Sequence, residues 1–182
     1  MSIRVFVPRD STALALGANE VAEAIAREAA ARKIDIQLVR NGSRGMFWLE
    51  PLVEVEINGE RLAFGPVGED DVASLFDANF ILGKPHPLFL GKTEEIPFLK
   101  NQERLTFARI GVTDPRSLDD YLSHEGYVGL KHALSMTQEQ IVQQVTESGL
   151  RGRGGAAFPT GIKWNTVLTT QATQKYIVCN AD

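Results

Sequence analysis

Cysteine and histidine are scarce in this sequence, which limits the metal and redox sites that it can build. Cys179 is the one cysteine among 182 residues, so an intrachain disulfide framework is excluded. A four-cysteine zinc or iron–sulfur site made by this chain alone is excluded for the same reason. The histidines, His86, His124 and His132, are scattered and lack metal-site spacing. We expect no metal ligands and a buried, unreactive Cys179.

Long apolar runs and an excess of basic charge are also missing. No stretch approaches the roughly 18 apolar residues of a membrane span, and the first residues lack the basic and then apolar pattern of a signal peptide. The net charge of -4 gives no global signal for nucleic acid or for a membrane surface. We therefore expect a cytoplasmic protein with no membrane span and no nucleic-acid partner.

The first 82 residues alternate between strand and helix patterns. Short stretches rich in β-branched and aromatic residues predict strands, Asn58-Gly59 predicts a two-residue hairpin turn, and an Ala-, Glu- and Arg-rich stretch predicts a helix. The predicted elements are a strand at 3–8, a helix at 18–33, a strand at 34–42, a hairpin at 52–65 and a helix at 68–81. This order predicts a compact α/β domain over residues 1–82.

Prolines and glycines then mark a boundary. They concentrate in residues 83–97, which predicts a linker over 83–102. A second domain is expected over 103–182, with short helices near 117–126 and 127–135. Thr137 and Gln140 have the spacing of a capping box at the start of a further helix, and Gly149 stands where that helix would end in a left-handed residue. Another helix is expected after residue 160, and an apolar strand that ends in polar residues is expected at 175–182.

The stretch "SGLRGRGGAAFPTGIKW", residues 148–164, carries most of the functional information. Glycines let backbone N–H groups approach a phosphate closely, and Arg151, Arg153 and Lys163 offer charged donors. "GRGGAA" fits a loose G-x-G-x-x-[GA] pattern, but a helix precedes it where a dinucleotide fingerprint requires a strand. The alternative is an Arg/Gly-rich structural loop, and apolar residues such as Phe158 and Trp164 indicate that the loop is packed.

The same stretch, followed by "KYIVCNAD", closely resembles the flavin-binding signature of the NADH-oxidising flavoprotein subunit of respiratory complex I. This family includes the diaphorase subunits of NAD-reducing hydrogenases and of soluble NAD-dependent formate dehydrogenases. The resemblance covers roughly residues 103–182. It implies the start of a Rossmann-like α/β domain with FMN and NAD as cofactors.

The resemblance also assigns cofactor-binding residues, and it assigns no catalytic side chain. It implies that the glycine-rich loop cradles the FMN phosphate, that Lys163 reaches the flavin, that Asn180 and Asp182 lie beside it, and that Phe158 stacks on the NAD adenine. The loop residues are Gly152, Arg153, Gly154 and Gly155. Ala157 stands where the family often has glycine, a change that is tolerated unless the site needs a positive φ.

The first domain resembles a thioredoxin-like [2Fe-2S] ferredoxin that has lost its cluster. The order of its elements is similar, but the loops that carry cysteines in such ferredoxins, here "RDSTALALG" and "NGSRGMFWLEP", contain none. A degenerate domain of this kind before a flavoprotein domain resembles the β subunit of soluble NAD-dependent formate dehydrogenase. Met46, Phe47 and Trp48 are then expected to be packing or interface residues.

The implied function is FMN-mediated electron transfer between NAD(H) and iron–sulfur centres, coupled to formate oxidation. The implied partners are a molybdenum-containing formate dehydrogenase α subunit and a small [2Fe-2S] ferredoxin-like subunit. A [4Fe-4S] cluster is expected only in a later part of the subunit, so this chain is expected to be an N-terminal part. The alternatives are a diaphorase subunit of an NAD-reducing hydrogenase or of complex I, and a non-catalytic docking or assembly fragment.

Overall fold

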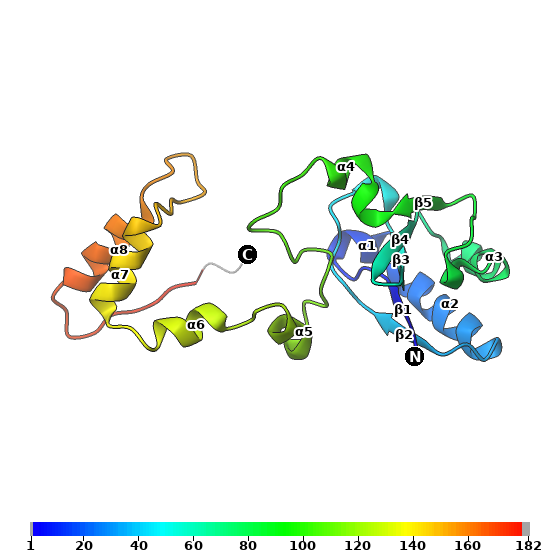
Figure 1. Ribbon diagram of the computed structural model, residues 1–182, viewed down its shortest axis with the longest axis horizontal. Coiled ribbons are helices and arrows are strands. Elements are labelled where there is room, and N and C mark those ends of the chain that lie inside the picture. The colour runs from blue at the N-terminus through cyan, green and yellow to red at the C-terminus, as the bar shows by residue number, and fades with distance from the viewer. Residues whose placement is uncertain (1, 180–182) are drawn as a thin grey trace. The chain divides into compact units, whose positions relative to one another are not determined.

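The computed structural model describes residues 2–179 (Figure 1). The chain divides into two compact units, Met1–His124 and Glu125–Asp182. In the described part of the chain, no helix is both long enough and apolar enough to cross a membrane.

The first unit is built on a mixed five-stranded sheet, which confirms the expected α/β class. The strands lie in the order β2-β1-β3-β4-β5, with β1 and β2 parallel and the other neighbours antiparallel. Their bounds are β1 Ile3–Phe6, β2 Ile36–Val39, β3 Val53–Ile57, β4 Glu60–Phe64 and β5 Phe89–Lys92. Asn58 and Gly59 have φ values of 53° and 80°, as the turn of the β3–β4 hairpin requires.

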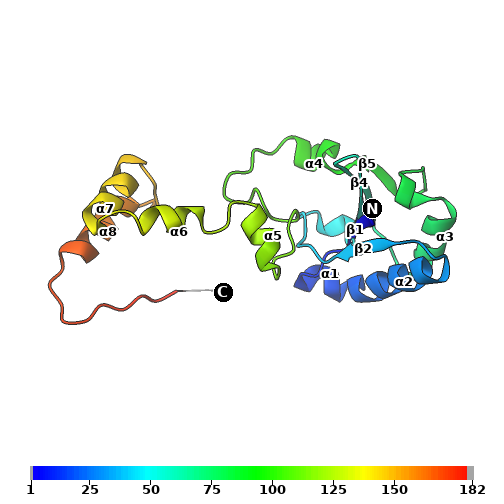
Figure 2. The ribbon, with the colours of Figure 1, turned by 60° about the horizontal axis from the view of Figure 1, so that its bottom comes forward.

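One face of the sheet carries the apolar core of this unit. Alternate residues of the strands, such as Val5, Val55 and Phe64, pack against apolar side chains of the helices, such as Ile25 and Leu75. The helices are α1 Ser11–Ala15, α2 Ala18–Ala31 and α3 Val72–Asp77. Figure 2 shows α2 running along the sheet beside β1 and β2. Short 3-10 turns complete the connections at Phe47–Leu49, Glu69–Asp71, Phe80–Leu82 and Thr93–Glu95.

The opposite face buries charge. Glu54 of β3 is fully buried, pairs across the sheet with Phe6 of β1 and Ala63 of β4, and forms a salt bridge with the buried Arg44. Arg61 of β4 lies with its guanidinium carbon 3.5 Å from the centroid of the Phe6 ring. A small second apolar cluster contains Ala63, the cross-strand partner of Glu54, together with Met46 and Leu99.

The stretch expected to be a linker, 83–102, belongs to the first unit instead. It contains β5, which pairs with β4, and α4, Pro97–Lys100. The prolines and glycines around β5 hid its strand pattern in the sequence. The strand forms because it pairs with β4, which lies far from it along the chain. The chain continues to contact the same unit beyond 103, because Arg61 donates hydrogen bonds to the carbonyls of Gly111 and Val112. Helix α5, Leu118–Ser123, also falls in this unit, so the boundary lies at 124–125 rather than at 102–103.

The described part of the second unit is helical. Its helices are α6 Val128–Ala133, α7 Gln138–Glu147 and α8 Thr160–Thr169. Thr137 and Gln140 form the expected capping box, and Gly149 has the expected positive φ, 67°. Over residues 125–179, the buried residues are two glycines, Gly126 and Gly161, so the apolar side chains here remain partly or fully exposed.

Two expectations for the end of the chain are wrong over the described residues. Residues 175–179 form no strand, since no other segment of the described chain pairs with them, and Ile177 and Val178 are almost fully exposed. Cys179 is exposed rather than buried for the same reason. Met46 is buried as a packing residue, whereas Phe47 and Trp48 are exposed, with Trp48 edge-on to Phe98.

Candidate functional site

The glycine-rich loop between α7 and α8 is closed at its base by backbone pairing. The amide of Thr160 donates to the Leu150 carbonyl at 2.9 Å, and the amide of Gly152 donates to the Phe158 carbonyl at 2.9 Å. Between these bonds, Arg151 and Pro159 form an antiparallel bridge. Figure 1 shows the loop at one end of the α7–α8 pair. The loop is therefore a defined structure and not an open tail.

The tip of the loop offers unused backbone donors. In the described structure, the amides of Gly154 and Gly155 donate no hydrogen bond, while the Gly154 carbonyl accepts one from the amide of Ala157 at 3.0 Å. A Cβ added to either glycine would meet nothing within 4 Å, and neither glycine has a positive φ. Neither packing nor backbone conformation within the described chain thus explains why these two positions are glycine. Close approach of a ligand to the backbone would explain it, because glycine has no side chain in the way.

Positive charge and an aromatic face adjoin this tip. Lys163, in the first turn of α8, holds its Nζ atom 5.6 Å from the centroid of the Phe158 ring. Phe158 remains 44% exposed, so one face can still receive a flat ligand. Helix α8 begins directly after the loop, so the positive end of its dipole faces the loop, and its N-cap, Pro159, makes no side-chain capping bond.

The two arginines of the loop are used differently. Arg151 donates from Nη1 to the Ala157 carbonyl at 3.1 Å, across the loop. Arg153 donates from Nη1 to the Arg151 carbonyl at 3.1 Å, two residues back along the chain. Arg151 is not among the residues that the resemblance assigns to the site, and its contact across the loop depends on a fold that the motif alone does not reveal.

The assigned residues therefore fall into two groups. Gly152, Arg153, Gly154 and Gly155 lie in the loop, with Phe158 and Lys163 directly after it. Asn180 and Asp182 lie outside the described residues. The expected packing of the loop by apolar side chains is only partial, because Phe158 and Trp164 are 44% and 46% exposed.

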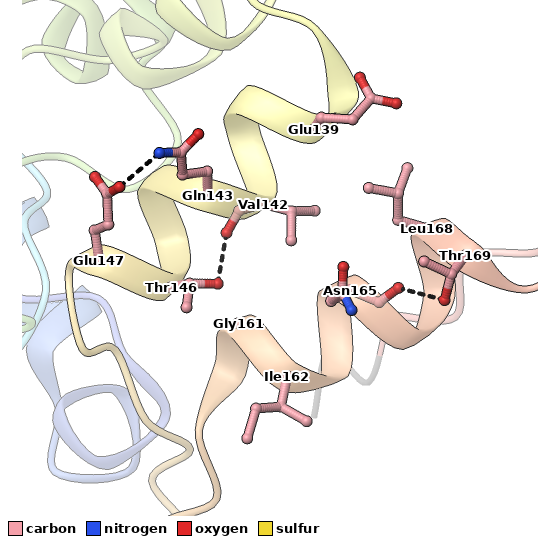
Figure 3. Close-up of a pocket in the computed structure, with 10 residues that line it drawn as sticks. All are labelled: Glu139, Val142, Gln143, Thr146, Glu147, Gly161, Ile162, Asn165, Leu168 and Thr169. Carbon is pink, nitrogen blue, oxygen red and sulfur yellow. Dashed lines mark hydrogen bonds between the residues drawn. The ribbon is translucent and has the colours of Figure 1, made fainter.

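A separate groove of about 760 Å³ lies between α7 and α8 (Figure 3). Val142, Ile162 and Leu168 supply apolar lining, and Glu139 and Glu147 supply acidic groups. Its lining includes none of the assigned residues, so it is distinct from the glycine-rich loop. Among the residues that the structure describes, no cluster of three or more His, Cys, Asp or Glu side chains is placed to hold a metal ion.

Comparison with known proteins finds a similarity over the part of the chain that contains this loop. Residues 145–182 match the family model described as the Nuo51 FMN-binding domain. The chain is 54% identical over 83 residues to the NADP-reducing hydrogenase subunit HndC of Solidesulfovibrio fructosivorans, covering 46% of this chain and 17% of that protein. It is 52% identical over 66 residues to a subunit of the NADH-quinone oxidoreductase of Streptomyces coelicolor, covering 36% of this chain and 15% of that protein.

A third relative is subunit alpha of the NAD-reducing hydrogenase HoxS of Cupriavidus necator, which is 42% identical over 72 residues, or 40% of this chain and 10% of that protein. The chain thus spans less than a fifth of the length of each of these relatives. Among solved structures, a thioredoxin-like [2Fe-2S] ferredoxin from Aquifex aeolicus is similar, with a TM-score of 0.44, 18% identity, and coverage of 53% of this chain and 96% of that one.

Proposed function

We propose that the loop at 150–160 and the first turn of α8 bind the phosphate of FMN in an NAD(H)-dependent oxidoreductase subunit. The observation that carries this proposal is the pair of unused amides at Gly154 and Gly155, on glycines that nothing in the described chain requires. Backbone donors of this kind, at the start of a helix, favour an anion. The match of residues 145–182 to an FMN-binding domain supports FMN as the ligand.

The residues of this chain have distinct parts in the proposed site. The loop amides and Arg153 hold the phosphate, Lys163 supplies a second positive charge, and Phe158 offers a face for the adenine of NAD(H). Bound FMN would supply the chemistry of hydride and single-electron transfer. Asn180 and Asp182 belong to the same proposal through the resemblance of the N-A-D segment.

The electron donor is a finer proposal. We propose coupling to formate oxidation by a molybdenum-containing α subunit, with a small [2Fe-2S] ferredoxin-like subunit and a [4Fe-4S] cluster held later in the subunit as further parts of the complex. The absence of cysteine from the ferredoxin-like domain supports this choice. The names of the relatives support the alternative, a diaphorase subunit of a hydrogenase or of an NADH-quinone oxidoreductase. Reduction of NAD⁺ by the purified complex is measured with formate and with hydrogen as electron donors. Activity with formate supports the formate proposal, and activity with hydrogen supports the hydrogenase alternative.

The phosphate site is tested by comparing FMN with riboflavin, which has the same ring system and no phosphate. Each ligand is titrated into the chain and followed by quenching of flavin fluorescence. We expect FMN to bind at least about tenfold more tightly, because a hydrogen bond to a charged group adds at least this much. Arg153→Gln should reduce that preference, while Lys131→Gln on α6 removes the same charge and should leave it unchanged. Equal affinity for the two flavins would contradict the proposal.

A further inference from the structure

Ala157 has a backbone conformation that normally belongs to glycine. Its φ is 44°, within the left-handed region that L-residues with a Cβ rarely adopt. The glycines of the tip, Gly154 and Gly155, do not have positive φ values, so the backbone strain of the loop is concentrated at this alanine. An alanine in this conformation persists only where surrounding contacts hold it.

Two hydrogen bonds hold Ala157, and both come from within the loop. Its amide donates to the Gly154 carbonyl at 3.0 Å, which closes the turn that presents the free amides. Its carbonyl accepts from Nη1 of Arg151 at 3.1 Å, so the guanidinium spans the loop from one arm to the other. Next to this contact, the hydrogen bond from the Gly152 amide to the Phe158 carbonyl holds the two arms of the loop together at its base.

We infer that Arg151 is a positioning residue: it holds Ala157 in the left-handed conformation and so keeps the Gly154–Gly155 amides presented for an anion. This inference rests on the proposed phosphate site and deepens it. In that proposal Arg153 contacts the phosphate. Its guanidinium bonds to a carbonyl two residues back along the chain, whereas the guanidinium of Arg151 crosses the loop to Ala157. The motif therefore contains one arginine that binds the ligand and one that shapes the loop.

The inference predicts that residues 151 and 157 are energetically coupled. Glycine at 157 adopts a positive φ without steric cost, so a loop with Ala157→Gly should depend much less on Arg151. We expect Arg151→Gln to lower the affinity for FMN about tenfold, with little change for riboflavin. General destabilisation of the chain would lower both affinities together. Adding Ala157→Gly to Arg151→Gln should restore most of the loss.

The matched control uses the other arginine. Ala157→Gly added to Arg153→Gln should restore none of the FMN affinity, because a lost ligand contact is not replaced by a relaxed loop. If Ala157→Gly fails to rescue Arg151→Gln, or if Arg151→Gln has no effect, then Arg151 does not act through Ala157 and the inference is overturned.

A second readout needs no flavin and separates this inference from the proposed function. Amide hydrogen exchange of the peptide covering 150–160 is measured in the ligand-free chain. We expect Arg151→Gln to speed exchange at the Gly152 and Ala157 amides, and added Ala157→Gly to slow it again. If the chain does not prefer FMN over riboflavin, the phosphate site fails while this exchange cycle still decides the positioning role. Unchanged exchange in Arg151→Gln would overturn that role.

Discussion

Glu54 and Arg44 form a salt bridge of 2.9 Å on the sheet face opposite the apolar core, with side chains that are 0% and 4% exposed. Arg61, on the neighbouring strand, approaches the second oxygen of Glu54 at 3.5 Å. One buried carboxylate thus compensates two arginines that are themselves largely removed from water. Taking such charges out of water is costly, so each of them depends on the others for its place in the fold.

We predict that Glu54→Gln destabilises the first unit by about 3–5 kcal/mol, because it leaves Arg44 and Arg61 without their shared counter-charge. Urea unfolding followed by circular dichroism measures the change. Glu60→Gln is the matched control, since Glu60 pairs with Lys92 where both side chains are more than half exposed. It should change the free energy of unfolding by less than about 1 kcal/mol. Equal losses of unfolding free energy in the two variants would show that the buried salt bridge contributes no more to stability than the exposed one.

The same cluster holds the chain segment 104–112 against the sheet. Arg61 donates to the carbonyls of Gly111 and Val112, and the Asn41 side-chain amide donates to the Gly111 carbonyl at 2.8 Å. Gly111 has a φ of 77°, and a Cβ there would overlap Cδ of Arg44 and lie 3.1 Å from its Cα. Because Glu54 and Glu94 both bind the guanidinium of Arg44, that side chain has little freedom to move away.

Gly111→Ala should therefore release this segment. Gly59→Ala is the control: Gly59 has a φ of 80° with nothing within 4 Å of an added Cβ, so it tests the backbone conformation alone. We expect Gly59→Ala to lower the free energy of unfolding by about 1–2 kcal/mol. Gly111→Ala should lower it by about 1–3 kcal/mol more, because its Cβ also overlaps Arg44. Trypsin cleavage after Arg104 and Arg109 should become faster in Gly111→Ala only. Equal cleavage of the two variants would mean that the contact with Arg44 does not hold the segment.

Local signals in the sequence predicted the elements that depend on local chemistry. The Asn58-Gly59 turn and the Thr137–Gln140 capping box are both present, because each is determined by a few adjacent residues. The sequence could not show that Glu54 is buried. Its strand alternates valine with glutamate, a pattern typical of a sheet with one solvated face, and the arginines that allow its burial come from elsewhere in the chain.

In the candidate site, too, the local motif could be recognised in the sequence and the contacts between distant atoms could not. Arg153, Gly154 and Lys163 are assigned from the motif, and the structure has the first two in one loop and Lys163 in the first turn of the helix that follows it. The motif also identified Ala157 as the departure that would matter if a positive φ were needed, and the structure gives that φ as 44°. The role inferred for Arg151 required the contact across the loop, which no spacing in the sequence shows.

Glu50 makes the stability of the first unit depend on pH. Burial raises the pKa of its carboxyl above the ordinary 4.5, against the opposing hydrogen bonds from the Ser43 hydroxyl and the Leu52 amide. The folded chain then keeps a proton that the unfolded chain has already lost. Stability contributed by this group is therefore present below pH 4.5 and falls as the pH rises through the raised pKa.

Glu50→Gln should remove that part of the pH dependence, because the amide stays neutral throughout. Urea midpoints measured from about pH 4 to about pH 7 should fall less steeply with pH in this variant than in the unmodified chain. Glu23→Gln, at an exposed position on α2, should keep the original slope. A slope unchanged by Glu50→Gln would assign the pH dependence to other groups.

Gly161 allows α7 and α8 to pack closely beside the candidate site. A Cβ at Gly161 would lie 2.7 Å from the Thr146 Cα, a backbone atom that cannot move without shifting α7 (Figure 3). Gly161→Ala should therefore separate the helices at the base of the loop, even though alanine favours a helix by itself.

Gly129→Ala is the control, because Gly129 lies in α6 with nothing within 4 Å of an added Cβ. It should stabilise that helix by up to about 1 kcal/mol. Hydrogen exchange should speed up in α7 and α8 of Gly161→Ala and slow down in α6 of Gly129→Ala. Slower exchange in α8 of Gly161→Ala would mean that helix propensity outweighs the close approach, and that the base of the loop tolerates a wider helix pair.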